Sequence, residues 1–129
     1  MIKPGEVYRI KMYRTDNIDP KNYAYRYKYI IVVGYDGDKL YGVVATNTRD
    51  HHLVPIEFQY PLTHQGYKCF VNCYQLHQVS ITRLTQDCYE GKISDDDLEL
   101  IVGSIKTSPI VSEKTIKKFG LDVFQIDDE

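Results

Sequence analysis

Alternating apolar and polar positions dominate the first three quarters of the chain and predict a series of β-strands. The segment GEVYRIKMY has this period of two, which predicts a half-buried strand from about Gly5 to Tyr13. The polar segment RTDNIDPKN that follows predicts a loop. Further strands are predicted in NYAYRYKYIIVVGY, KLYGVVATNT and LVPIEFQY, with a tight hairpin turn at Asp36-Gly37 and a loop at PLTHQG.

The second predicted strand carries two different sets of side chains. Successive side chains of a strand point to opposite sides, so one face holds tyrosines and the other holds cations. The tyrosine face comprises Tyr23, Tyr25, Tyr27 and Tyr29, and the opposite face comprises Ala24, Arg26 and Lys28.

The segment YKCFVNCYQLHQVS contains two cysteines and a histidine and raises the question of a zinc site. Its composition favours a strand over YKCFVNCYQL, in which Cys69 and Cys73 would lie about 13 Å apart. Two thiolates on one zinc ion lie within about 4 Å of each other. We therefore expect no shared metal, a packing role for both cysteines and for Cys88, and a surface or structural role for His77.

The hydrophobic period changes near the end of the chain, where GKISDDDLELIVGSIKTSP predicts a helix that ends before Pro109. Ser94 followed by Asp97 is a capping-box pattern, and three aspartates fill the first turn, where the helix dipole favours negative charge. Consecutive helical residues fan out by about 100°, which makes a shared metal a poor interpretation of these aspartates. The apolar stripe expected to pack on the sheet is Leu98, Ile101, Val102 and Ile105.

The composition fits one soluble domain, because 129 residues with 43% hydrophobic and 26% charged residues can bury one modest core. No secretory or membrane-spanning segment is recognised, so we expect a cytoplasmic protein with reduced cysteines. We expect a single domain over residues 1–129. It would comprise a barrel over about 4–86, a helix over about 94–107, and an extra helix, SEKTIKKFG, with an acidic tail over 110–129.

Charge is unevenly distributed, although the net charge is only -2. Basic residues exceed acidic ones over residues 1–49, and acidic residues exceed basic ones over residues 50–129. Most tyrosines lie between residues 8 and 41, among these basic residues, and this combination suits single-stranded nucleic acid. A solvated charged face and a tyrosine-rich sheet wall explain the same pattern equally well.

Taken in order, PGEVYRI, a polar loop, YKYIIVVG, GVVATNT, CFVNCYQLHQVSITRL and GKISDDDLELI resemble the PemK/MazF family of toxins from bacterial toxin-antitoxin systems. The resemblance covers roughly residues 4–107 and depends on order and spacing rather than on one unique motif. It implies a mainly β fold with α, a small SH3-like β-barrel with a C-terminal helix. It also implies a homodimer that cleaves single-stranded RNA without a metal or cofactor, and an antitoxin partner that occupies the RNA groove.

Members of this family carry an arginine and then a proline entering the second strand and a threonine or serine leaving the third. The resemblance places these positions at Lys28, Tyr29 and Thr46. Lysine keeps the positive charge but lacks the planar fork with which arginine holds two phosphate oxygens. Arg26, on the same predicted strand face, is a second candidate for that role. The residues expected to contact RNA are Tyr27, Asn47, Arg49 and Arg14.

Cleavage by an RNA 2′-hydroxyl also needs a base, for which His51, His52, His64 or an aspartate are the candidates. Two other functions remain open. A barrel of this fold without catalysis would be a binding module for nucleic acid or for a protein such as DNA gyrase. A structural or phage-encoded interaction protein would instead use a sheet edge for assembly.

Overall fold

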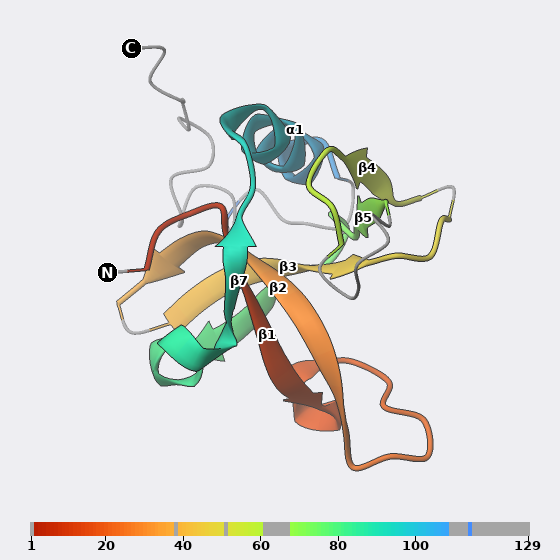
Figure 1. Ribbon diagram of the computed structural model, residues 1–129, viewed down its shortest axis with the longest axis vertical. Helices are drawn as coiled ribbons and strands as arrows, with labels where there is room; N and C mark the ends of the chain where they lie inside the picture. The colour runs from red at the N-terminus through yellow and green to blue at the C-terminus, as the bar shows by residue number, and fades with distance from the viewer. Residues whose placement is uncertain (1, 38, 51, 61–67, 109–113, 115–129) are drawn as a thin grey trace.

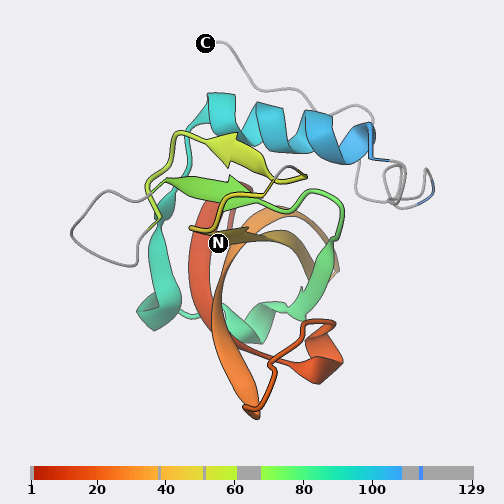
Figure 2. The same ribbon diagram turned by 90° about the vertical axis from the view of Figure 1, so that its right-hand side faces the viewer.

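The computed structural model describes every residue except 1, 38, 51, 61–67, 109–113 and 115–129. Seven antiparallel strands form one sheet in the order β4-β5-β3-β2-β1-β7, with β6 also paired to β3. The sheet curls into a half-barrel, and α1 lies across one end of it beside β4 and β5 (Figure 1, Figure 2). The predicted small barrel with a C-terminal helix is therefore confirmed.

The elements and their bounds follow in chain order. The strands are β1 (Glu6–Tyr13), β2 (Tyr25–Asp36), β3 (Lys39–Thr46), β4 (Val54–Ile56), β5 (Cys69–Val71), β6 (His77–Ser80) and β7 (Tyr89–Lys92). The helical elements are the short 3-10 turns η1 (Arg14–Asp16), η2 (Ile81–Arg83) and η3 (Gln86–Cys88), and the helix α1 (Asp95–Lys106). Within the described residues, no helix is both long and apolar enough to cross a membrane.

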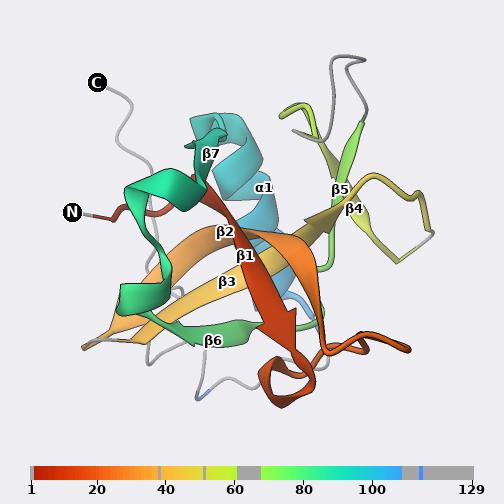
Figure 3. The same ribbon diagram turned by 60° about the horizontal axis from the view of Figure 1, so that its bottom comes forward.

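The central strands are buried on both faces, which explains the continuous apolar run YIIVVG. Ile31 and Val43 belong to a core that also contains the buried stripe of α1. Ile30 and Leu40 belong to a second core on the other side of the sheet, which includes Val79 of β6. Figure 3 shows β6 running beside β3, with which it pairs. The four residues predicted to anchor the helix are all buried: Leu98, Ile101, Val102 and Ile105.

The start of α1 has the predicted cap, but the aspartate of the capping pattern binds elsewhere. Ser94 Oγ accepts a hydrogen bond of 3.1 Å from the Asp97 backbone N–H. The buried Asp97 carboxylate does not reach back to Ser94. It accepts 2.9 Å hydrogen bonds from the backbone N–H groups of Glu57 and Phe58, just after β4. The helix start is thereby joined to the sheet, an attachment that local sequence pattern does not reveal.

The predicted continuous strand YKCFVNCYQL is wrong, because a turn separates β5 from β6. The Asn72 N–H donates to the Val44 carbonyl oxygen, and the Asn72 side chain accepts from the Tyr74 N–H. The side chain thus competes with strand pairing, as asparagine commonly does in turns. Cys69 and Cys73 are nevertheless free and buried as expected, and burial raises the pKa of each thiol to about 12.

Other predicted boundaries are close to those observed. Strand β1 matches its predicted range to within one residue, whereas β2 begins at Tyr25, so Tyr23 precedes the strand. The hairpin between β2 and β3 is confirmed by the pairing of Asp36 with Lys39. Strand β7 pairs with β1, so the sheet continues beyond residue 86. The predicted PLTHQG loop and most of the SEKTIKKFG helix lie outside the described residues.

Gly42 of β3 lies against a core side chain, where any added side chain would clash. A Cβ atom at this position would lie 2.5 Å from Ile30 Cγ1 and 2.8 Å from the Ile31 carbonyl oxygen. The backbone oxygen cannot move away without disturbing the β2–β3 pairing. Gly103, on the exposed side of α1, has no neighbouring atom within 4 Å of such a Cβ.

We predict opposite effects of alanine at these two glycines on the free energy of unfolding. Gly42→Ala should destabilise the protein by about 1–3 kcal/mol through overpacking. Gly103→Ala should stabilise it by up to about 1 kcal/mol, because alanine favours the helix interior. Urea unfolding followed by circular dichroism measures both, and equal effects would contradict the described packing of β2 on β3.

Candidate active site

The structure brings Lys28 and Thr46 to neighbouring strands on the same face of the sheet. Tyr29 of β2 pairs with Ala45 of β3. Lys28 precedes Tyr29 on β2, and Thr46 follows Ala45 on β3. Because the strands are antiparallel, both residues lie one position beyond this pair at the same end. Both side chains point to the face opposite that of Tyr29, because side chains alternate along each strand. The two positions that the resemblance selected therefore lie side by side, although they are far apart in the sequence.

A positive cluster surrounds Lys28. Burial lowers the pKa of the half-buried Lys28 ammonium, and the charges of Arg26 and Lys21 lower it further. Arg26 lies two residues earlier on β2 and therefore on the same face as Lys28. Lysine and arginine charges held this close repel each other, and an anion placed among them would relieve the repulsion. This site is suited to a phosphate group.

Thr46 ends β3 and begins the connection to β4. Its hydroxyl oxygen accepts a hydrogen bond of 3.2 Å from the Thr48 backbone N–H, which leaves the hydroxyl proton available to donate to a phosphate oxygen. Asn47 and Arg49 follow in this connection, and both are exposed. Arg49 lines a hollow with Asp50, Leu53, Pro55, Lys68 and Phe70.

His52 is the more exposed of the two histidines in the described part of the chain. Its Nδ1 lies 3.3 Å from a carboxylate oxygen of Asp50, and its ring lies 6.0 Å from that of Tyr74. The turn containing Tyr74 is hydrogen-bonded to β3 through Val44, close to Thr46. An imidazole that is partly exposed and oriented by a carboxylate is a common arrangement for a general base. His51 and His64 lie outside the described residues.

His77 begins β6 and is only 4% exposed, so the surface alternative is wrong and the structural one holds. Its Nδ1 lies 3.0 Å from the Asp16 carbonyl oxygen, which can only accept, so Nδ1 carries the proton. Burial lowers the pKa of His77; the Asp16 carbonyl and carboxylate oppose this effect, and the Lys28 charge adds to it. His77 is therefore a neutral support beside Lys28.

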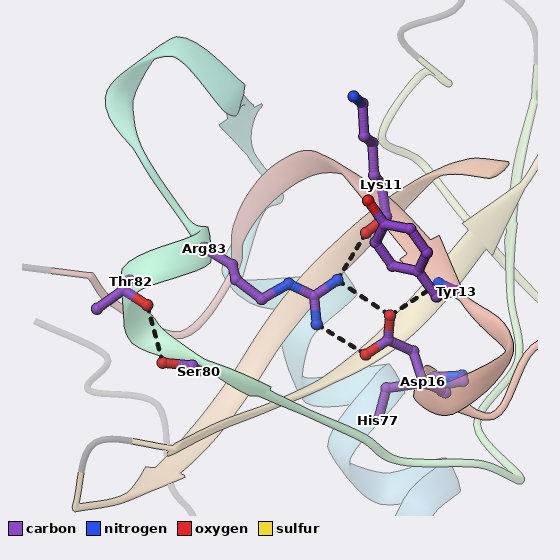
Figure 4. A network of polar contacts seen from close by, with 7 residues as sticks. All are labelled: Lys11, Tyr13, Asp16, His77, Ser80, Thr82 and Arg83. Atoms are coloured by element: carbon purple, nitrogen blue, oxygen red, sulfur yellow. Dashed lines mark hydrogen bonds and ion pairs between the residues drawn. The ribbon is translucent and has the colours of Figure 1, made fainter. Parts of the chain in front are cut away.

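An ion pair fixes the connection between β1 and β2 next to His77 (Figure 4). Arg83 donates to both carboxylate oxygens of Asp16, at 2.7 and 3.0 Å, and to the Lys11 carbonyl oxygen at 2.6 Å. The same carboxylate accepts from the Tyr13 N–H at 2.8 Å. Sequence reasoning missed this pair, because its members are separated by 67 residues.

Two of the predicted RNA contacts lie away from the Lys28 face. Tyr27 points to the opposite face of β2, as alternation requires, and is 44% exposed. Arg14 lies in η1, where its exposed guanidinium is 4.0 Å from an Asp19 carboxylate oxygen. The predicted site thus divides into a Lys28–Thr46 face, the loop after β3, and the opposite face of β2. No cluster of three or more histidine, cysteine, aspartate or glutamate residues able to hold a metal occurs among the described residues.

Comparisons with known proteins support the fold. No family model matches the chain, and no curated protein matches its sequence. A solved structure described as an endoribonuclease from mycobacterial species is similar, with a TM-score of 0.57 and 19% sequence identity. The match covers 84% of this chain and 93% of that chain. At this identity the likeness establishes the shared architecture, and any shared activity has to be argued from the side chains.

The Asp16–Arg83 pair predicts a specific loss of stability in acid. Burial alone would raise the pKa of Asp16, but hydrogen bonds from Arg83 and from the Tyr13 N–H outweigh it and lower the pKa. The ionised carboxyl therefore stabilises the fold above its unfolded-state pKa, and this contribution disappears as pH falls through the lower folded-state pKa. Asp16→Asn should cost about 2 kcal/mol at neutral pH and progressively less in acid.

Asp19→Asn is the matched control, because Asp19 lies in the same connection but its side chain is 74% exposed. Urea unfolding of both variants at several pH values tests the prediction. A constant difference between Asp16→Asn and the wild type at all pH values would show that the carboxylate charge has no part in the network.

Proposed function

We propose that this protein is a toxin-like endoribonuclease that cleaves single-stranded RNA without a metal ion, as one component of a toxin-antitoxin system. The observation that carries the proposal is the position of Lys28 beside Thr46 on one face, inside the positive cluster that includes Arg26. The family resemblance selects the same two positions. The similarity to a solved endoribonuclease structure supports the same class of reaction.

The proposed reaction uses the RNA itself as the nucleophile. The ribose 2′-hydroxyl loses its proton to a base, and its oxygen attacks the adjacent phosphorus. The bond from phosphorus to the 5′-oxygen of the next nucleotide then breaks, and that oxygen takes up a proton. The products are a 2′,3′-cyclic phosphate and a new 5′-hydroxyl end, with no net change in charge.

Each candidate side chain has one task in this scheme. Lys28 stabilises the negative charge that develops on the phosphate oxygens, and Arg26 attracts the neighbouring phosphate. Thr46 donates a hydrogen bond that orients the reacting phosphate. His52, held by Asp50, accepts the 2′-hydroxyl proton. Lysine replaces the bidentate arginine of the family, so we expect a lower rate than a guanidinium at position 28 would give.

The proposal includes partners that the family resemblance implies. A homodimer would cover exposed sheet edges of the half-barrel, and an antitoxin would occupy the RNA-binding surface. A cytoplasmic location and a single functional domain over residues 1–129 belong to the same proposal. A catalytically inactive binding module is the competing function, and it is favoured by the lysine at position 28.

We predict that the purified protein cuts a long single-stranded RNA in the presence of EDTA and leaves 5′-hydroxyl ends. Electrophoresis of the products and labelling of new ends by polynucleotide kinase measure this directly. His52→Asn should lower the cleavage rate, because it removes the proposed base. Intact RNA at high protein concentration would favour the binding module, and a strict need for Mg²⁺ would contradict the metal-free mechanism.

We further predict that Lys28→Ala lowers the cleavage rate about a hundredfold, equivalent to roughly 3 kcal/mol of lost charge stabilisation. Lys28→Arg should retain or raise the rate, because the guanidinium supplies charge and two aligned donors. Arg26→Ala should have a smaller effect. Lys39→Ala is the matched control, since Lys39 is an exposed lysine at the other end of β3. Equal rates for all these variants would mean that the reaction occurs on another face.

A further inference from the structure

We infer that a ladder of tyrosines and cations on the reverse face of the β1–β2 ribbon binds the unpaired bases and phosphates of single-stranded RNA. The tyrosine–cation ladder consists of Arg9, Lys11, Tyr13, Tyr25 and Tyr27. It lies on the opposite side of β2 from Lys28 and Thr46. The inference rests on the proposed function for its substrate class, but it concerns binding and does not require catalysis.

The ladder is a continuous set of ring and charge contacts across two strands. The Tyr13 and Tyr25 ring centroids are 5.8 Å apart, and those of Tyr25 and Tyr27 are 5.7 Å apart. The Arg9 guanidinium lies 3.8 Å from the Tyr27 ring centroid, and the Lys11 ammonium lies 4.7 Å from that of Tyr25. All five side chains share one face, because β1 pairs with β2 in the register Lys11 to Tyr27 and Tyr13 to Tyr25.

The ladder is open to solvent at the strand tips and closed toward the helix. Tyr13, Tyr25 and Tyr27 are 41%, 36% and 44% exposed. The next tyrosine along β2, Tyr29, is buried and packs edge-on against Tyr60 with ring centroids 4.8 Å apart. Figure 1 shows the tips of β1 and β2 extending away from α1. The tyrosine ladder expected from the sequence is therefore part core wall and part exposed surface.

The two cations of the ladder form no ion pair with the described residues. Within the part of the chain that the structure describes, neither Arg9 nor Lys11 has a carboxylate at ion-pair distance. The nearby Asp16 carboxylate is already bound by Arg83. Cross-strand ring pairs by themselves contribute to the stability of the ribbon. Two cations held against exposed rings, without an ion-pair partner among the described residues, additionally provide sites for phosphates next to surfaces on which bases can stack.

A hollow beside the ladder has the size and chemistry to hold part of a nucleotide. It has a volume of about 320 Å³ and lies along the outer edge of β1, between the ladder and η2–η3. Its lining combines basic groups, tyrosine rings and two smaller apolar side chains: Arg9, Lys11, Arg83, Tyr13, Tyr27, Ile10 and Cys88. A larger hollow between β4 and α1 is lined by three acidic residues, Glu57, Asp96 and Asp97, and by one lysine, Lys68, so it is less suited to phosphate.

One RNA strand can contact both faces of the ribbon at its projecting end. Strand β3 pairs with β2 only from Tyr29 onward, so residues 25–27 have no β3 partner on that edge. A single strand that crosses this open edge would meet Arg26 and Lys28 on one face and Tyr25 and Tyr27 on the other. The ladder would then hold nucleotides adjacent to the scissile phosphate, and a duplex, whose bases are already stacked, would be excluded.

The experiment measures binding of a short, fluorescently labelled 2′-O-methyl RNA oligonucleotide by anisotropy, since such a strand cannot be cleaved through its 2′-hydroxyl. Tyr27→Ala should weaken binding about tenfold, and Tyr27→Phe should change it by less than about twofold, because stacking needs the ring and not the hydroxyl. Arg9→Gln should weaken binding and reduce the slope of log affinity against log salt by about 0.7.

Tyr35→Ala is the matched control, because Tyr35 is also on β2 and 43% exposed but lies at the hairpin end. It should bind like the wild type, and thermal unfolding should show that every variant is folded. Affinity unchanged in Tyr27→Ala and Arg9→Gln would overturn the inference. Equal binding of an RNA duplex and of the single strand would also overturn it. So would ladder variants that lose self-association but still bind RNA, because the ladder would then be an interface between copies of the chain.

The outcomes separate this inference from the proposed function. A wild-type protein that binds the oligonucleotide through the ladder but cuts no RNA would support the ladder and refute the endoribonuclease. A wild-type protein that cuts RNA, with ladder variants that bind and cut equally well, would refute the ladder and support the endoribonuclease.

Discussion

The alternation of side-chain direction along β2 is the constraint on which both the core and the candidate site depend. In the middle of the strand, Ile30 and Ile31 are fully buried on opposite faces, one in each core. A shift of one residue would exchange the two faces along the whole strand, so burial fixes the register strongly. The same register continues to the beginning of the strand, where cations face one side and tyrosines the other. Packing in the middle of β2 thereby determines the chemistry at its end.

Polar contacts hold the projecting part of the β1–β2 ribbon, in addition to the buried side chain of Met12 on one of its faces. Arg83 binds the Asp16 carboxylate and the Lys11 carbonyl oxygen, and His77 binds the Asp16 carbonyl oxygen. These contacts join η1 and β1 to β6 and η2. They fix the backbone beneath Lys11 and Tyr13, so a ligand that stacks on the ladder would meet a surface that is already ordered, which reduces the entropic cost of binding.

The local pattern of apolar and polar residues was sufficient to predict an element where one period extends over a long segment, as in β1, in β2 and in the buried stripe of α1. It failed where a single polar side chain redirected the backbone, as Asn72 does between β5 and β6, or where the partner is distant in sequence, as for Asp97 and Phe58. The proximity of Lys28 and Thr46 followed from the family resemblance and from the register of β2 against β3. The ladder could be recognised only in part from the sequence. Alternation identifies the tyrosine face of β2, but it does not identify the strand that pairs with this part of β2 and supplies the cations.

The most direct test of the central claim is an NMR titration of the protein with the 2′-O-methyl RNA oligonucleotide, followed through backbone amide shifts. If one strand contacts both faces of the ribbon, shifts should concentrate in Arg9–Tyr13 of β1, in Tyr25–Lys28 of β2 and around Thr46, and α1 should remain unchanged. Shifts confined to α1 and β4, or to the loop after β3 without β1, would contradict the account.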